Sequence, residues 1–475
     1  MKSIKTYSHI FILFSGLWLS ACSNNAEENP PPPNLVLILA DDLGYADVGF
    51  NGCTDIPTPN IDRIAKEGVI FSNGYVTWAA CGPSRAGMIT GRYQDRFGFS
   101  RNPLFAPNDP NMGLPLSEQT LPEALEQANY KSVAIGKWHL GAHPTQRPLQ
   151  RGFTDFFGFL TGGHQYFPEK WTLADEYEVT SQYEAYRTKL LRNEVRIEEQ
   201  EYLTDALSRE AAAYIKKYQA DPFFIYLAYN APHAPLQASD KYLDRFEHIS
   251  DPKRKTYVAM VSSIDDGVGR VLDQLDSLGL SENTLVVFLS DNGGPERVNG
   301  SDNGPLRGQK GDLFEGGIRV PFAMRWKGKI SAATQYDPPI SALDIFATIV
   351  AQNQERVQLK NPIDGVDLIP YLSGEAKGMP HSQLFWRRHD QKKVAIRQGD
   401  IKLQTIDTVS LLFNLKHDIG EQENLTNKEN ETLQQLQTAQ AQWNSQMLDP
   451  VFMGLAFDSI YNVLHPDRFA RPEGQ

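Results

Sequence analysis

One cysteine of the sequence stands where a thiol could react. Cys81 opens the segment CGPSRAGMITG, in which Pro83 suits the first turn of a helix and Gly91 suits its end. Cys81 would then lie at a helix N-terminus, with Arg85 about one turn further on. Free backbone amides and the positive end of the helix dipole make such a position an anion site and lower the pKa of a thiol. Taken alone, the segment favours a plainer interpretation, in which Cys81 is a small buried side chain.

Acidic and amide side chains follow two strongly apolar segments of the chain. Residues 34–40 (NLVLILA) end at Asp41 and Asp42, and residues 284–290 (TLVVFLS) end at Asp291 and Asn292. Uninterrupted apolar runs of this length are typical of strands that are buried on both faces. An isolated Asp is more often a helix cap or a turn former, so neither pair indicates a site by itself.

The sequence around these segments alternates between strand and helix patterns. Another apolar strand-like run covers residues 222–228, and apolar residues recur at helical spacing in residues 61–68, 121–128, 204–218 and 255–278. This alternation predicts an α/β fold with a doubly wound sheet that carries helices on both faces. Ligands of such sheets gather at the carboxyl ends of the strands, so we expect the two acidic pairs to converge there.

The pattern changes after about residue 361. Short strand-like runs separated by turns lie at 384–386, 394–397, 401–403 and 411–415, and a helical pattern covers 430–446. These runs predict a smaller antiparallel subdomain closed by one helix. We therefore expect a catalytic domain over residues 34–365 and a C-terminal subdomain over residues 366–475.

The composition excludes several classes of protein. Three cysteines are too few for a disulfide scaffold. With 36 Gly, 30 Pro and 11% aromatic residues, the chain is neither collagen-like nor disordered. The formal charge is −12, from 46 Lys and Arg against 58 Asp and Glu, which argues against a nucleic-acid partner. Any anion that the protein binds must therefore be attracted by a local positive site.

The first 33 residues predict export and a lipid anchor. A basic start precedes an apolar run at 10–19 that is too short to span a bilayer, so residues 1–21 are a predicted signal peptide. LSAC at 19–22 resembles the lipobox of bacterial lipoproteins, in which the cysteine, here Cys22, carries the lipid; the alternative is an ordinary cleavage site with an incidental cysteine. Residues 22–33 end in four prolines and predict a stiff tether. We expect attachment through the lipid anchor alone, in the periplasm or on the outer-membrane surface of a bacterial cell envelope.

The segment at Cys81 resembles a family signature. Cys-x-Pro-Ser-Arg at 81–85 with Thr-Gly at 90–91 is similar to the sulfatase motif, in which the cysteine is oxidised to formylglycine. Further motifs of that family follow in order: LADDLG at 39–44, GKWHLG at 136–141, APHAP at 231–235, SDNGG at 290–294, GQKG at 308–311 with EGG at 315–317, and LFNLK at 412–416 with Asp418, Gly420, Glu421 and Asn424. The chain is identified as a member of the formylglycine-dependent type I sulfatases of the alkaline phosphatase superfamily. The resemblance implies a large, mixed, mostly parallel sheet flanked by helices, with a smaller C-terminal antiparallel sheet.

The resemblance assigns the two acidic pairs to a metal site. The residues that match the family's metal ligands are Asp41, Asp42, Asp291 and Asn292, with Cys81 beside the ion. Three carboxylates and an amide suit one hard cation such as Ca²⁺, without which three buried carboxylates would repel one another. The absence of a His-rich ligand set argues against the two-zinc site of phosphatases that share this fold.

The resemblance also implies a reaction. Residue 81, as formylglycine, is hydrated to a geminal diol; one hydroxyl attacks sulfur to form a covalent sulfate ester, and the other loses its proton and expels sulfate. The cations that match those holding the nucleophile and the sulfate are Arg85, Lys137 and Lys310. His139 matches the base of the second step, and His233 matches the acid that protonates the leaving alcohol, although an isolated loop histidine is more often structural. A formylglycine-generating or radical maturation enzyme would act on Cys81 before export.

The substrate is expected to be a sulfated carbohydrate, such as an algal galactan (carrageenan) or a glycosaminoglycan. Candidate contacts are loop residues: His164, Gln165, Asn303, Arg307 and the run Arg387-Arg388-His389, for which the alternative is a solvated basic turn. Candidate stacking platforms for sugar rings, which could equally be core residues, are Trp78, Tyr166, Trp171 and Trp386.

Two other functions stay open on the sequence. One is a phosphoester or phosphonate hydrolase of the same superfamily, because related enzymes also use formylglycine. The second is a non-catalytic glycan-binding lipoprotein, which the complete set of catalytic and metal-ligand residues disfavours.

Overall fold

The computed structural model describes residues 4, 6 and 31–470. The predicted signal peptide, apart from two isolated residues, and Cys22 lie outside the described residues. From Pro32 onward the described chain forms one compact unit. Within the described ranges, no helix has the length and apolar character needed to cross a membrane.

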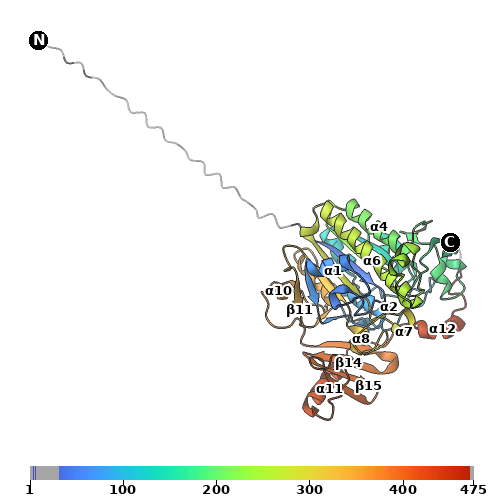
Figure 1. Cartoon of the computed structure of the whole chain (residues 1–475), viewed down its shortest axis with the longest axis vertical. Helices are drawn as coiled ribbons and strands as arrows, with labels where there is room; N and C mark the ends of the chain where they lie inside the picture. The colour runs from blue at the N-terminus through green and yellow to red at the C-terminus, as the bar shows by residue number, and fades with distance from the viewer. Residues whose placement is uncertain (1–3, 5, 7–30, 471–475) are drawn as a thin grey trace. The chain divides into compact units, whose positions relative to one another are not determined.

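The main layer of the fold is a ten-stranded sheet (Figure 1). Its strand order is β11-β2-β10-β9-β1-β8-β4-β5-β6-β7. The strands span Asn34–Ala40 (β1), Val69–Phe71 (β2), Lys131–Lys137 (β4), Asp155–Phe159 (β5), Leu191–Arg192 (β6), Val195–Arg196 (β7), Phe223–Ala228 (β8), Thr284–Ser290 (β9), Phe322–Arg325 (β10) and Thr334–Tyr336 (β11). The central strands β9, β1, β8, β4 and β5 are parallel, whereas β10 and β6 pair antiparallel with their neighbours. The structure confirms the predicted mixed, mostly parallel sheet.

After Asn34, strand β1 has no polar residue on either face. Leu35, Leu37 and Leu39 pack into one hydrophobic core, and Val36 and Ile38 pack into another. Successive side chains of a strand point to opposite faces, so a strand that separates two cores must be apolar throughout. The apolar sequence of β1 ends at Ala40, where the strand reaches the edge of both cores and Asp41 follows.

Helices cover both faces of the sheet. One core packs against α1 (Pro59–Lys66), α4 (Leu203–Lys217), α5 (Asp240–Leu243) and α6 (Pro252–Ser277), and the other against α2 (Cys81–Thr90), α3 (Leu121–Leu125) and α9 (Leu343–Ala351). Shorter elements are α7 (Glu296–Asn299), α8 (Glu315–Ile318), α10 (Ile369–Leu372), α12 (Asp458–Leu464) and the strand pair β3 (Gly74–Tyr75) and β12 (Ile340–Ser341). The four helices predicted from apolar spacing are present, with boundaries shifted by up to three residues.

The C-terminal part of the chain forms a second, antiparallel sheet (Figure 1). It contains β13 (Leu384–Arg388), β14 (Lys393–Gln398), β15 (Ile401–Ile406) and β16 (Val409–Asn414), and α11 (Asn430–Asn444) packs against it. Phe385 and Trp443 stack with ring centroids 4.9 Å apart and join this sheet to the helix. The antiparallel sheet and its closing helix confirm the predicted fold class; the domain boundary at residues 365 and 366 stays a prediction.

Candidate active site

The two acidic pairs meet at the carboxyl end of the central sheet. Ala40 of β1 is the register partner of Ser290 of β9, so the residues that follow them leave the sheet side by side. The Asp291 amide donates to the Ala40 carbonyl at 3.0 Å. Asp41, Asp291 and Asn292 are fully buried, and Asp42 is 3% exposed. The predicted convergence is confirmed.

Cys81 is the first residue of α2 and is 1% exposed. The helix ends at Gly91, whose φ of 67° lies in the left-handed region that favours glycine. The Cys81 Sγ lies 3.3 Å from Asp41 Oδ1 and 3.1 Å from Lys310 Nζ. Burial, followed by the charges of Asp291 and Asp41, raises the pKa of the Cys81 thiol. The interpretation that the segment favoured by itself, a small buried side chain, agrees with this position, where desolvation and the carboxylates outweigh the helix dipole.

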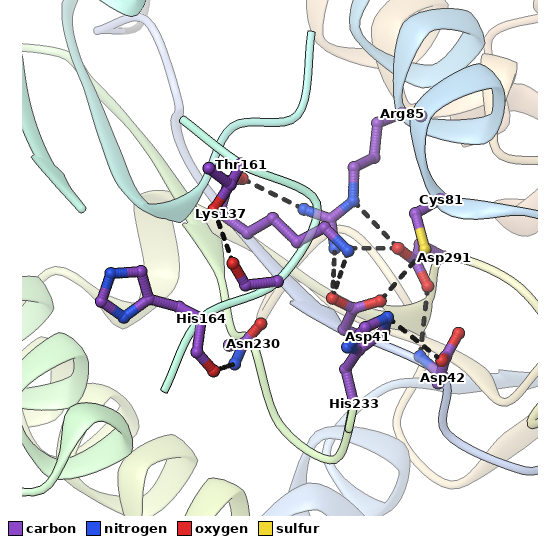
Figure 2. A network of polar contacts seen from close by, with 12 residues as sticks. Asp41, Asp42, Cys81, Arg85, Lys137, Thr161, His164, Asn230, His233 and Asp291 are labelled. Atoms are coloured by element: carbon purple, nitrogen blue, oxygen red, sulfur yellow. Dashed lines mark hydrogen bonds and ion pairs between the residues drawn. The ribbon is translucent and has the colours of Figure 1, made fainter. Parts of the chain in front are cut away.

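Three cations neutralise the three buried carboxylates, and Figure 2 shows two of them, Arg85 and Lys137, beside Asp41 and Asp291. Arg85 donates from Nε to Asp291 Oδ2 at 2.9 Å and from Nη1 to the Lys137 carbonyl at 3.1 Å. Lys137 Nζ donates to Asp41 Oδ2 at 2.5 Å, and Lys310 Nζ donates to Asp42 Oδ1 at 2.6 Å. Helix α2, the end of β4 and the loop before α8 each supply one of these cations. These three positive charges match the three carboxylates, so the residues alone do not form the local positive site that the acidic chain requires.

Two histidines face this cluster. His139 follows β4, is 6% exposed, and has a buried Nδ1 without a hydrogen-bond partner among the described residues. Burial, followed by the charges of Lys137 and Arg85, lowers its pKa well below the usual value. His233 Nδ1 lies 2.5 Å from the Ala234 carbonyl, and its Nε2 lies 3.7 Å from Asp42 Oδ2. Burial lowers the pKa of His233 to about 3 despite the charge of Asp42, so both rings are neutral at pH 7.

The donor set fits a hard cation. Ligand atoms of Asp41, Asp42, Cys81 and Asp291 all lie within 4.8 Å of one another. Asn292 Oδ1 is buried and has no hydrogen-bond partner within residues 31–470, while its Nδ2 donates to Asp42 Oδ1 at 2.7 Å. A buried carbonyl oxygen without a donor is costly, and a cation would remove that cost.

A family model for sulfatases matches residues 33–353 of the chain. The chain belongs to the sulfatase family. N-acetylgalactosamine-6-sulfatase of Homo sapiens is 37% identical over 379 residues, which cover 76% of this chain and 69% of that protein. The same enzyme of Canis lupus familiaris is 37% identical over 405 residues, which cover 81% and 74%.

Solved structures support the same assignment. The crystal structure of Ps i-CgsB in complex with k-i-k-neocarrahexaose is 37% identical with a TM-score of 0.85, and the match covers 93% of this chain and 98% of that chain. The phosphonate monoester hydrolase of Agrobacterium radiobacter, at 20% identity, a TM-score of 0.61 and coverage of 87% and 95%, shares the fold alone. The protein is a sulfatase, an enzyme that hydrolyses sulfuric esters.

Three of the residues predicted to contact substrate are buried in this sulfatase. The His164 ring is fully buried, with Nδ1 and Nε2 at 2.9 and 2.7 Å from the carbonyl oxygens of Gln165 and Thr188, and it points away from the cluster (Figure 2). Arg387 is 6% exposed and donates to the Leu448 carbonyl at 3.0 Å. Asn303 is fully buried and donates to the Gly294 carbonyl. The polar atoms of these three residues contact buried backbone carbonyls, and their role in binding substrate stays a prediction.

The other candidates have different surroundings. Gln165 is half-buried and accepts a hydrogen bond from Gln237, and exposed Arg307 lies 4.0 Å over the Phe314 ring. Both stay predicted substrate contacts. Arg388 is half-buried and donates to the carbonyl of Gly311, the residue after Lys310.

The predicted stacking platforms are largely core residues. Tyr166 is fully buried, Trp386 is 1% exposed and Trp171 is 4% exposed. Trp78, at 8%, lies three residues before Cys81 and lines a cavity.

A buried ion cluster that the sequence did not reveal holds the loop of Lys310. Lys402 of β15 is fully buried, and its Nζ lies 2.8 Å from Glu315 Oε1 and 2.9 Å from Glu421 Oε1. Glu421 Oε2 also accepts from the Glu315 amide at 2.7 Å. Burial opposes ionisation of Glu315, but Lys402 lowers its pKa to about 2; burial raises the pKa of Glu421. The C-terminal sheet thus anchors the segment that delivers Lys310 to Cys81.

Proposed function

We propose that this sulfatase removes sulfate from a sulfated carbohydrate, either an algal galactan such as carrageenan or a glycosaminoglycan. The observation that carries the proposal is the buried position of Cys81, with Sγ 3.1 Å from a lysine and within reach of three carboxylates. The substrate class is supported by the complex of Ps i-CgsB with a neocarrahexaose. It is also supported by relatives named for N-acetylgalactosamine 6-sulfate.

Formylglycine derived from Cys81 would supply the nucleophilic hydroxyl, and one Ca²⁺ held by Asp41, Asp42, Asp291 and Asn292 would supply positive charge beside it. Lys310 lies where it would orient the nucleophilic oxygen, because its Nζ already contacts the side chain of residue 81. The buried side chains of Arg85 and Lys137 would hold Asp291 and Asp41 in place beside the nucleophile and offset their charges.

The histidines would move the protons. Neutral His139 has a free ring nitrogen and can remove the proton from the second hydroxyl when sulfate leaves. Neutral His233 donates from Nδ1 to the Ala234 carbonyl, so its Nε2 carries no proton. To act as the acid, His233 would first take up a proton from solvent at Nε2, where Asp42 lies 3.7 Å away, and then give that proton to the leaving alcohol oxygen. Without an ion, three cations match three carboxylates; a divalent cation gives the site an excess positive charge that favours a sulfate anion.

Sulfate release and mass spectrometry of residue 81 test this proposal together. We expect the active protein to carry an aldehyde at position 81, and Cys81→Ala to release no sulfate from p-nitrophenyl sulfate or from sulfated oligosaccharides. Cys53→Ala is the matched control, because Cys53 is the other free cysteine of the described chain. Retained activity in Cys81→Ala would refute the mechanism, and faster cleavage of phosphate or phosphonate esters than of sulfate esters would refute the substrate class.

We also propose that the mature protein is anchored in the bacterial cell envelope through a lipid on Cys22. The support is the sequence LSAC at 19–22 and the proline-rich tether after it. Metabolic labelling with palmitate should label the wild type but not Cys22→Ser. Equal membrane retention of the two proteins would contradict the anchor.

A further inference from the structure

A cavity of about 180 Å³ lies beside the proposed nucleophile. Three separate parts of the chain line it: the residues just before α2, the loop at 100–102, and the C-terminal segment 454–457, together with Gly311, Arg388 and Asp390. At ~30 Å³ for each water molecule, the cavity has room for about six waters, which suits one small ring better than an extended chain.

The walls of this cavity belong to the residues that position Cys81 and Lys310. Ala80 is the residue before Cys81, and the Asn102 side chain accepts from the Gly82 amide at 2.9 Å. Gly311 follows Lys310, and its amide donates to the Ala79 carbonyl at 2.7 Å. The cavity wall therefore contains the chain neighbours of both Cys81 and Lys310.

The lining combines apolar faces with fixed charges. Leu455, Phe457 and Trp78 supply apolar surface, and the indole Nε1 of Trp78 has no hydrogen-bond partner in the described part of the chain. Arg101 pairs with Asp390 at 2.9 Å and lies 4.7 Å over the Phe457 ring. Apolar faces with a few fixed polar groups are typical of sites that recognise a sugar ring.

The charge of the lining is positive. Arg101 is neutralised by Asp390, whereas Arg388 donates to a backbone carbonyl and lies 6.0 Å from the Trp78 ring centre. A guanidinium has five N–H donors, so Arg388 keeps donors for a ligand. The cavity therefore favours a ring that carries an anionic group.

We propose that this cavity is a specificity subsite for the sugar unit next to the sulfated one, and that Arg388 selects a unit with its own anionic substituent. The inference rests on the proposed function, and it assigns a binding role to the C-terminal segment 454–457. The ligand that Arg388 would bind is an anionic group on the neighbouring sugar, either a second sulfate or the carboxylate of a uronate.

Kinetics on matched substrates test the subsite. The probes are p-nitrophenyl sulfate, which has no neighbouring sugar, neocarratetraoses with one or two sulfates per disaccharide, and a chondroitin sulfate disaccharide with its uronate. Ala456→Trp fills the cavity from an exposed position, and Val463→Trp, at a residue 78% exposed on the following helix, is the matched control.

We expect Ala456→Trp to lower the ratio of oligosaccharide to aryl sulfate kcat/KM at least tenfold, with no change in Val463→Trp. Arg388→Gln should raise KM for the cleaved anionic oligosaccharide by about 10- to 100-fold, the range for one hydrogen bond to a charged group. If KM rises for the doubly sulfated neocarratetraose, the group bound by Arg388 is a sulfate; if it rises for the chondroitin sulfate disaccharide, the group is a carboxylate.

Equal losses on the aryl sulfate and the oligosaccharides would overturn the subsite and leave the proposed function standing. If the wild type cleaves only the aryl sulfate, the sulfatase reaction stands, and both the carbohydrate substrate and the subsite are wrong. If it cleaves neither ester, the proposed function itself fails.

Discussion

Replacing Lys402 by Met tests whether the C-terminal sheet positions the catalytic loop. The variant keeps most of the aliphatic stem but removes Lys402 from both glutamates, so that buried Glu421 loses its paired cation and Glu315 keeps Arg319 at 3.4 Å. Removing one partner of a buried ion cluster typically costs about 3–5 kcal/mol, because the remaining charge has no compensation. Lys392→Met, at the turn before β14, is the matched control: its pair with Asp407 is exposed, at 3.4 Å, and is worth about 1 kcal/mol or less.

The measurement is urea unfolding followed by tryptophan fluorescence, with sulfate release from p-nitrophenyl sulfate assayed in parallel. Lys402→Met should lose at least about 3 kcal/mol of unfolding free energy at pH 7. Its kcat/KM should also fall, since Glu315 lies in the loop that carries Lys310. The deficit should shrink toward pH 5, because the two carboxylates can then bind protons in the folded variant. Glu315→Gln with Glu421→Gln in the Lys402→Met background should recover much of the stability. A loss no larger than that of Lys392→Met, or one independent of pH, would refute this reasoning.

Three other perturbations have defined outcomes. His381 pairs with Asp344 at 2.8 Å, and Asp344 raises the pKa of His381 although burial opposes the charged form. The pair stabilises the fold fully below about pH 6.5, and this contribution is lost as the pH rises through the raised pKa. His381→Gln should therefore destabilise the protein more at pH 6 than at pH 8.5, unlike His248→Gln at an exposed position. Equal losses at the two pH values would contradict the pairing. Chelation with EDTA should lower Tm, and Ca²⁺ at 100 times its Kd should restore about 2.7 kcal/mol of unfolding free energy. An unchanged Tm would argue against a resident cation. Gly136 has φ 97°, and a Cβ added there would lie 2.0 Å from the Ala228 carbonyl oxygen, whereas Gly279 has φ 67° and open space around it. Gly136→Ala should therefore lower the melting temperature, measured by circular dichroism, more than Gly279→Ala. A similar loss in the two variants would show that the contact with β8 does not cause the destabilisation.

The sequence predicts the centre of the fold better than its edges. β1 and β9 are apolar on both faces, and this pattern alone indicates buried parallel strands whose following residues share one edge of the sheet. The outer strands β2, β10 and β11 have three or four residues each, too few for any periodic signal. Neither the antiparallel pairing of β10 nor the parallel pairing of β11 with β2 could therefore be foreseen.

The site divides in the same way. Cys81, Lys137 and Asp291 lie inside motifs and next to strand or helix ends, so their convergence follows from topology. His164, in a loop, and Arg387, in β13, carry polar side chains without any sequence sign of whether these face substrate or contact buried carbonyls. Lys402 occupies an inward position of a short strand, and only the tertiary structure shows that two glutamates surround it.

The burial of Cys81 has a consequence for when the protein can mature. Its Sγ is covered by Lys310, a residue synthesised 229 positions later, and the side chain is 1% exposed once the sheet is complete. An enzyme that oxidises this thiol cannot reach it in the finished protein, so the proposed conversion must occur while α2 is still unpacked. Folding then competes with oxidation of Cys81. A chain that folds first keeps the thiol, stays inactive, and is no longer a substrate for the maturation enzyme. Slowing the arrival of β9 at the sheet should therefore raise the fraction of active enzyme.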